Sequence, residues 1–125
     1  MSNKPWFDAY PAGTPHEIVM PASNTSLIDV FEKSIQQFGS RYAFVCRGKA
    51  ITYSELDQKS RQFAAYLQSL GLKKGARVAV MMPNVLQYPI SVLAIIRAGY
   101  VLVNVNPLYT ARELEHQLKD SGSEV

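Results

Sequence analysis

The sequence predicts an α/β fold: a partial parallel sheet with flanking helices, built from βαβ units and preceded by a β-hairpin and an irregular leader. Two runs, residues 77–82 and 100–105, are apolar at both odd and even positions, as strands covered on both faces are. Helical patterns follow each run, and such alternation implies right-handed crossovers and a parallel sheet. With 125 residues, of which 47% are hydrophobic and 18% charged, the chain is long enough to bury a core.

Residues 1–25 predict the irregular leader, because they show no helical period and hold four of the seven prolines: Pro5, Pro11, Pro15 and Pro21. The leader also carries Trp6, Phe7 and Tyr10. We expect these three aromatic side chains to anchor the leader to the folded body.

Three helices share the same start signal, a hydroxyl residue followed three positions later by an acid, which is the spacing of a capping box. The pairs are Ser26 with Asp29, Thr52 with Glu55, and Thr110 with Glu113. The glycines that follow predict the ends of these helices, at Gly39, Gly71 and Gly122. The first helix, residues 26–38, repeats apolar residues on one face: Leu27, Phe31, Ile35 and Phe38.

Residues 42–46 and 49–53 are short β-prone runs separated by Arg47 and Gly48, which predicts a tight hairpin. A fourth helix is expected over about residues 85–98, with Gly99 as its cap. Pro89 must lie near its first turn or kink it, because proline removes an internal hydrogen bond. The last two residues, 124 and 125, look like the beginning of another strand.

The charge and the cysteine content of the chain limit the kinds of partner and the cellular compartment that we expect for it. The net charge is +3, and residues 41–77 hold eight basic against two acidic residues. Such a surface can attract anionic phosphates or an anionic membrane surface, but nucleic-acid binders show a denser basic stripe, so no nucleic-acid partner is expected. The absence of a signal sequence and the lone Cys46 indicate a cytoplasmic protein, with peripheral association at the inner membrane as a further expectation.

The common catalytic signatures are absent from the sequence. Neither phosphate-cradling glycine motif occurs, nor does a Gly-x-Ser-x-Gly elbow, so we assign no catalytic residue. His16 and His116 lie far apart without ligand-like neighbours, so we assign no metal ligand. Cys46 reads as a buried inert thiol in preference to a nucleophile. Gly71 to Gly75, with two lysines, reads as a helix cap and turn, because phosphate loops follow a strand.

One segment remains as a candidate ligand site: residues 104–110, just beyond the carboxyl end of the second predicted strand. Ligands bind at that edge of open α/β sheets, and the following helix N-terminus offers N–H groups to an anion. The alternative is that Asn106, Pro107 and Thr110 simply form a turn between strand and helix.

Several motifs together resemble the bacterial long-chain fatty-acid–CoA ligases of the adenylate-forming, AMP-binding superfamily, which includes luciferases and peptide-synthetase adenylation domains. They are Trp6-x-x-x-Tyr10-Pro11, Ile51-Thr-Tyr-Ser-Glu-Leu56, Gly75-x-Arg77-Val-Ala-Val-Met-Met-Pro-Asn84, Leu86-Gln-Tyr-Pro89, and the stretch from Arg97-Ala-Gly99 through Asn104-Val-Asn-Pro-Leu-Tyr-Thr110 to Leu118. The resemblance covers nearly the whole chain. It implies that residues 1–25 are a leader and residues 26–125 the N-terminal portion of an adenylate-forming domain, truncated at its C-terminal end.

The resemblance also implies an activity for the parent enzyme. ATP and a fatty acid give an acyl-adenylate and pyrophosphate, and CoA then displaces AMP, with Mg²⁺ neutralising phosphate charge. The family's phosphate loop, adenylate motif, ribose-binding Asp and catalytic Lys match no position of this sequence. We therefore expect the chain alone to be inactive and to bind ATP, Mg²⁺ and CoA weakly at most. By resemblance, Asn106, Pro107, Leu108 and Tyr109 form a loop on the CoA side of the cleft.

Two other hypotheses stay open on the sequence alone. The chain could be an interaction module without catalysis, forming a homodimer or pairing with a ligase through its unfinished sheet edge. It could also be a small nucleotide-binding α/β domain of flavodoxin type.

Overall fold

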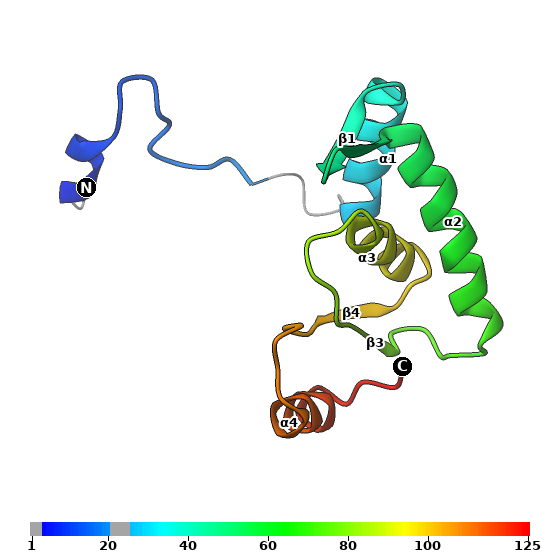
Figure 1. The fold of residues 1–125 in the computed structure, drawn as a ribbon. Coiled ribbons are helices and arrows are strands. Elements are labelled where there is room, and N and C mark those ends of the chain that lie inside the picture. Colours follow the sequence, from blue (N-terminus) through cyan, green and yellow to red (C-terminus); the bar gives the residue numbers. More distant parts are fainter. Residues whose placement is uncertain (1–3, 21–25) are drawn as a thin grey trace.

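The computed structural model describes residues 4–20 and 26–125, and it has the predicted α/β architecture (Figure 1). A short 3₁₀ helix, η1 (Pro5–Ala9), lies in the leader. The body follows in the order α1 (Leu27–Phe38), β1 (Tyr42–Cys46), β2 (Lys49–Thr52), α2 (Tyr53–Ser69), β3 (Arg77–Val80), α3 (Gln87–Arg97), β4 (Val101–Asn104) and α4 (Ala111–Ser121). Among the described residues, no helix is long and apolar enough to cross a bilayer.

The central pair of strands is parallel, as predicted, with Val78 of β3 opposite Leu102 of β4. The other edge of β3 bonds to the last two residues of the chain. Glu124 N donates to Arg77 O at 2.8 Å, and Ala79 N donates to Val125 O at 2.7 Å. β3 therefore lies between β4 and residues 124–125, which is the pairing expected of the start of another strand.

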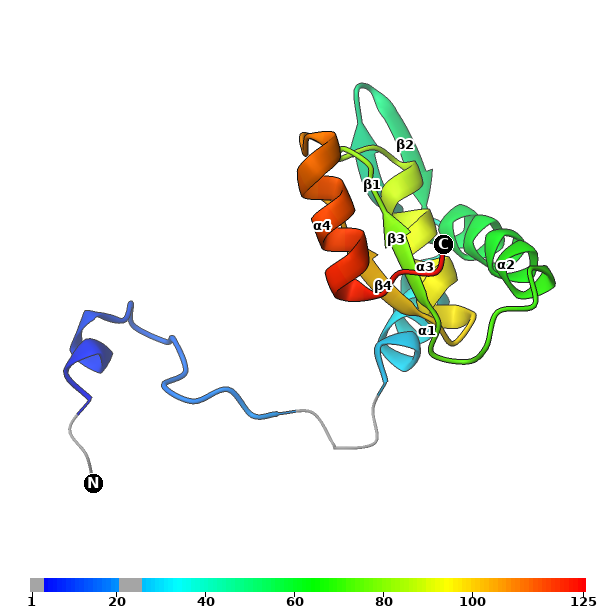
Figure 2. The ribbon, with the colours of Figure 1, turned by 90° about the horizontal axis from the view of Figure 1, so that it is seen from below.

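The helices α3 and α4 lie on opposite sides of the β3–β4 pair, as the views in Figures 1 and 2 show. α2 packs along α3, and the core between these two helices and the sheet contains Leu67, Val78, Val80, Ala94 and Ile95. A smaller cluster joins the hairpin to the helices through Ile51, Leu56 and Leu93.

The prediction that both strands are buried on both faces is wrong for β4. Val101 is 47% exposed, and Leu102 and Val103 are only half-buried. The physical reason lies in α4, which has no buried residue and so covers its side of the strand pair loosely. β3 is closer to the prediction, because Val78 and Val80 are buried and Ala79 is half-buried.

The local signals in the sequence mostly hold. Arg47 and Gly48 both have positive φ, 49° and 74°, as a two-residue hairpin turn between β1 and β2 requires. All three capping boxes are formed, at the N-termini of α1, α2 and α4. Pro89 is the third residue of α3, within the first turn, where its missing N–H has no helical partner to lose.

Gly39 follows directly after Phe38, the last residue of α1, so the predicted end of this helix is confirmed. The φ of Gly39 is −44°, in the right-handed region. A Cβ atom at this position would lie 2.8 Å from Ser54 Oγ at the start of α2. Gly39 thus allows the end of α1 to approach α2 closely.

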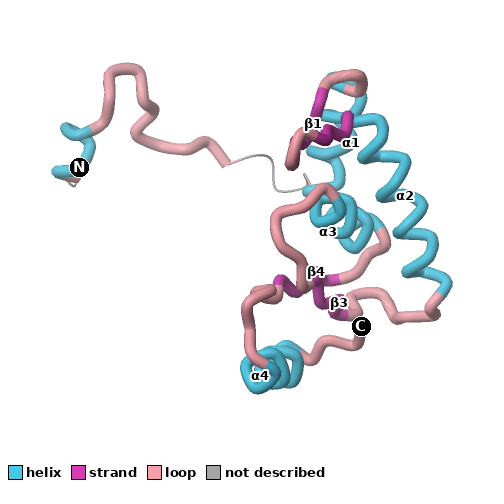
Figure 3. The backbone as a smooth tube through the Cα atoms, in the orientation of Figure 1, coloured by secondary structure: helices cyan, strands magenta, loops and turns pink. Residues whose placement is uncertain are grey.

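The leader corrects a second expectation, since its aromatic residues pack on one another. Phe7 stacks on His16 with ring centroids 4.4 Å apart, and Tyr10 lies edge-on to Phe7 at 5.6 Å. Trp6 stays exposed, and residues 4–20, largely loop in Figure 3, stand apart from the body in both ribbon views. The predicted leader also includes residues 1–3 and 21–25, Pro21 among them, which lie outside the described residues.

Candidate functional site

The candidate loop begins where β4 ends. Val105 N donates to Val80 O at 3.0 Å, which extends the ladder with β3 one residue beyond the strand. The chain then leaves the sheet at Asn106 and enters α4 at Ala111. The segment therefore lies at the carboxyl edge of the parallel pair, where the sequence predicts a ligand site.

Asn106 organises the turn of this loop. Its side-chain oxygen accepts a hydrogen bond from Leu108 N at 3.0 Å, and its carbonyl oxygen accepts one from Tyr109 N at 3.1 Å. Leu108 at the tip is 86% exposed, and Tyr109 is 37% exposed. The segment is thus a well-defined turn, as the simpler interpretation predicts, and it also presents an apolar and an aromatic side chain to a ligand.

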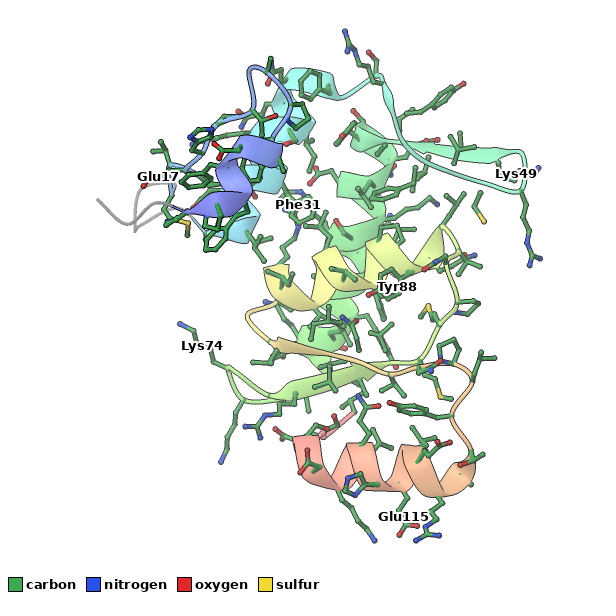
Figure 4. The ribbon with its side chains drawn as sticks, turned by 90° about the vertical axis from the view of Figure 1, so that its left-hand side faces the viewer. Glu17, Phe31, Lys49, Lys74, Tyr88 and Glu115 are labelled. Carbon is green, nitrogen blue, oxygen red and sulfur yellow. The ribbon has the colours of Figure 1, made fainter. Side chains whose placement is uncertain are left out.

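Two side chains hold the base of the loop from different helices. Tyr88 Oη of α3 donates to Asn104 Oδ1 at 2.8 Å. Gln117 Nε2 of α4 donates to the backbone oxygen of Asn104 at 2.7 Å. Figure 4 shows Tyr88 on the helix that faces the strand pair. Neither residue could be predicted from the sequence as part of the site, because they lie 16 and 13 positions from Asn104.

The N-terminus of α4 differs from the expectation that it offers N–H groups to an anion. Thr110 N and Thr110 Oγ1 donate to Glu113 Oε2 at 2.8 and 2.7 Å, and Glu113 N donates back to Thr110 Oγ1 at 3.5 Å. These bonds hold the pKa of Glu113 below its usual value, the side-chain bond with Thr110 contributing most. An incoming anion would meet a carboxylate here, so the loop is better suited to an uncharged part of a ligand.

The other candidate residues lie away from this loop. Cys46 is half-buried, and its thiol donates to Asn84 O at 3.4 Å. It lines a hollow of about 310 Å³ between β1 and the start of α3, together with Phe44, Val45, Val85, Leu86 and Pro89 among others. His16 stacks on Phe7 in the leader, whereas His116 is exposed on α4. Within the two described ranges, no group of three or more His, Cys, Asp or Glu side chains could hold a metal ion.

A network of ion pairs joins the helices at the C-terminal end of α3. Arg97 Nη2 of α3 bonds to Asp57 Oδ1 at 2.7 Å, and Arg97 Nη1 bonds to Glu32 Oε1 at 3.2 Å. Arg61 Nε also donates to Asp57, at 3.0 Å, and this hydrogen bond raises the pKa of Arg61. The network joins α1, α2 and α3 and is structural in its geometry.

Comparison with known proteins assigns the chain to a protein family. The family model described as AMP-binding enzyme matches residues 31–125. The long-chain-fatty-acid–CoA ligase of Escherichia coli O6:H1 is 56% identical over 96% of this chain and 21% of the ligase. That of Bacillus subtilis is 42% identical over the same shares. The chain spans about a fifth of the length of these relatives.

Solved structures give the same assignment. The N-terminal subdomain of Klebsiella oxytoca NpsA, in complex with anthranilyl-AMSN, matches with a TM-score of 0.74 and 32% identity. The match covers 78% of this chain and 26% of that one. A fusion of NpsA with ThdA, described as an adenylation-PCP di-domain, also matches with a TM-score of 0.74. On its sequence and its fold alike, this chain belongs to the AMP-binding enzyme family.

Proposed function

We propose that the chain forms the N-terminal portion of a long-chain fatty-acid–CoA ligase, with residues 1–25 as a leader and residues 26–125 as the start of its AMP-binding domain. The observation that carries this proposal is the 56% identity to the Escherichia coli ligase over 96% of the chain. The alignment spans 121 residues and so includes the loops as well as the helices and strands.

The proposed reaction has two steps. A carboxylate oxygen of the fatty acid attacks the α-phosphorus of ATP, forming the acyl-adenylate and releasing pyrophosphate. The CoA thiol, losing its proton, then attacks the acyl carbon, and AMP leaves with the pair of electrons from the broken bond. The adenylate is a mixed anhydride, so AMP is a good leaving group.

In this reaction the loop of Asn106, Pro107, Leu108 and Tyr109 lines the CoA side of the cleft. Its exposed side chains are apolar, aromatic or amide, and Glu113 already occupies the adjacent helix N-terminus. This chemistry favours the pantetheine arm of CoA, which is uncharged, over the nucleotide phosphates. The residues of this loop thus fit the pantetheine arm of CoA, but not its phosphates.

The described residues give less support for the binding of ATP and Mg²⁺. Residues 4–20 and 26–125 bring together no cluster of acidic side chains or histidines for a divalent cation. The Lys73–Lys74 turn precedes β3 instead of following a strand, so it cannot aim a helix N-terminus at a phosphate. No step is therefore assigned to ATP or Mg²⁺ through this chain, and we expect the isolated chain to be inactive.

A chimera tests the proposal. Residues 1–125 replace the aligned segment of the Escherichia coli ligase, and the formation of palmitoyl-CoA from palmitate, ATP and CoA is measured. We expect a rate within about tenfold of the parent ligase, whereas the 125-residue chain alone gives no palmitate-dependent exchange of pyrophosphate into ATP above a heat-inactivated sample. A soluble, folded chimera without ligase activity would contradict the proposal, and exchange by the isolated chain would contradict its inactivity.

The interaction module remains the second candidate, and one observation favours it. Val101 on β4 and Val125 beside β3 are each about half exposed, so both edges of the strand group carry uncovered apolar side chains. Gln117 weakens the case on the β4 side, since its amide already binds the outward-facing carbonyl of Asn104. Light scattering during size-exclusion chromatography separates the candidates: a module of this kind dimerises at high concentration, and a strictly monomeric chain rules out edge pairing.

A further inference from the structure

We propose that Tyr88 and Gln117 are positioning residues, which fix the orientation of the loop of residues 105–110 for its ligand. The proposal rests on the proposed function, since it concerns the ligand of that loop. Asn104 is the point at which both residues act: Tyr88 holds its side chain, and Gln117 holds its backbone carbonyl.

The backbone and the ring of Tyr88 are fixed by contacts other than its hydrogen bond to Asn104. It is the second residue of α3, its backbone N–H donates to Val85 O at 3.0 Å, and Pro89 restricts the backbone directly after it. Its ring is half-buried and packs against the core cluster that includes Val80 and Ala94. With the ring fixed by packing, the phenol oxygen can donate to Asn104 Oδ1 at 2.8 Å with little loss of rotamer freedom.

Gln117 reaches the carbonyl that the sheet leaves open. Val105 N bonds to Val80, so the neighbouring Asn104 carbonyl points away from β3 in a parallel ladder. Gln117 Nε2 donates to that carbonyl oxygen at 2.7 Å. The other amide atom, Gln117 Oε1, is buried and has no hydrogen-bond partner among the described residues. Turning the amide over would place two oxygen atoms against each other, so the bond to Asn104 fixes the direction of the side chain.

The two bonds come from helices on opposite sides of the strand pair (Figure 1). Together with the Val105–Val80 bond, they fix the base of the loop, whereas the turn itself is closed internally by Asn106. Losing one bond therefore leaves the shape of the turn intact and changes its orientation to the sheet. The consequence is weaker binding of the ligand that the loop contacts, with little change in folding.

The first test uses the chimeric ligase and the variant Tyr88→Phe, which removes only the hydroxyl group. The KM for CoA is expected to rise about threefold to tenfold, as the loss of one hydrogen bond predicts, while the KM values for ATP and palmitate stay unchanged. Tyr66→Phe is the matched control, because Tyr66 is an exposed tyrosine of α2. Asn104→Asp keeps an oxygen acceptor for Tyr88 and should retain the normal KM for CoA, whereas Asn104→Leu should raise it.

The second test needs no activity. Amide hydrogen exchange is measured in the 125-residue chain at Val105, whose N–H donates to Val80 O at the base of the loop, and Tyr88→Phe and Gln117→Met are each expected to accelerate it about threefold to tenfold. Exchange rates equal to those of the unmodified chain would overturn the inference, and so would an unchanged KM for CoA in an active Tyr88→Phe chimera. An inactive unmodified chimera counts against the proposed function alone, and hydrogen exchange then decides the positioning role.

Discussion

Arg97 on the last turn of α3 donates through Nη2 to Asp57 Oδ1 on α2, at 2.7 Å. The Arg97 side chain is only 10% exposed, and its second nitrogen reaches Glu32 on α1. Arg97 Nε is buried without a hydrogen-bond partner in the part of the chain that the structure describes. One arginine therefore links three helices, and the two carboxylates compensate its burial.

Replacing Arg97 should destabilise the fold. Arg97→Met keeps most of the apolar stem but removes the less exposed of the two arginines that contact Asp57 and Glu32, at a cost of about 1–3 kcal/mol in the free energy of unfolding. The cost stays below that of a fully buried pair because both carboxylates are partly exposed. Urea denaturation measures the change. Arg61→Met is the matched control: its side chain is 58% exposed, so it should cost less than about 1 kcal/mol, and equal losses would contradict the assigned role of Arg97.

Replacing Leu93 tests the packing between the helices and the hairpin. Its side chain is fully buried in the cluster with Ile51 and Leu56. Leu93→Ala leaves a cavity there, and the expected loss in the free energy of unfolding is about 2–5 kcal/mol. Leu27→Ala, on the exposed side of the first turn of α1, should change stability by less than about 1 kcal/mol. A Leu93→Ala variant as stable as Leu27→Ala would show that this cluster is not a core.

The lowered pKa of Glu113 predicts that the stability of the fold depends on pH. Its folded pKa is lowered by the side-chain and backbone hydrogen bonds from Thr110, so the ionised carboxylate stabilises the fold. This contribution is fully present above the ordinary glutamate pKa of about 4.3 and is lost as the pH falls through the lower, folded value. Glu113→Gln should therefore be less stable than the unmodified chain at pH 7, and the two should converge at acidic pH.

The control for this prediction is Thr110→Ala, which removes the hydroxyl that both donates to Glu113 and accepts from it. In that background, Glu113→Gln should alter the pH dependence less, as thermal unfolding across the acidic range would measure. An undiminished effect of Glu113→Gln would mean that the Thr110 hydroxyl is not the main cause of the lowered pKa.

Local features of the fold could be predicted from the sequence, because each depends on residues close together in the chain. The capping boxes need two residues three positions apart, and the hairpin needs only Arg47 and Gly48 to adopt positive φ. The parallel pairing of β3 and β4 followed from the alternation of apolar runs and helical patterns. Each of these signals lies within a short stretch of sequence.

Features that depend on distant residues could not be predicted. The need for glycine at position 39 comes from the close approach of Ser54. The ion pairs of Arg97 are formed with carboxylates 40 and 65 positions away. The edge of the sheet at which the candidate loop lies could be predicted from the sequence. The side chains of α3 and α4 that support the loop could not, since Tyr88 looks like an ordinary helical residue. The exposure of Val101 depends on how loosely α4 covers β4, which residue type alone does not reveal.

The proposed position of the loop of residues 106–109 on the CoA side of a ligase can be tested by chemical protection. Leu108→Cys is introduced into the chimera with Cys46 changed to Ser, and the rate of iodoacetamide labelling at position 108 is followed by mass spectrometry. Desulfo-CoA serves as the ligand because it lacks the thiol that would consume the reagent. We predict that saturating desulfo-CoA slows labelling at position 108 at least about fivefold and leaves a control, Leu27→Cys on α1, unchanged. Equal labelling rates at position 108 with and without the ligand would contradict the proposed position of the loop.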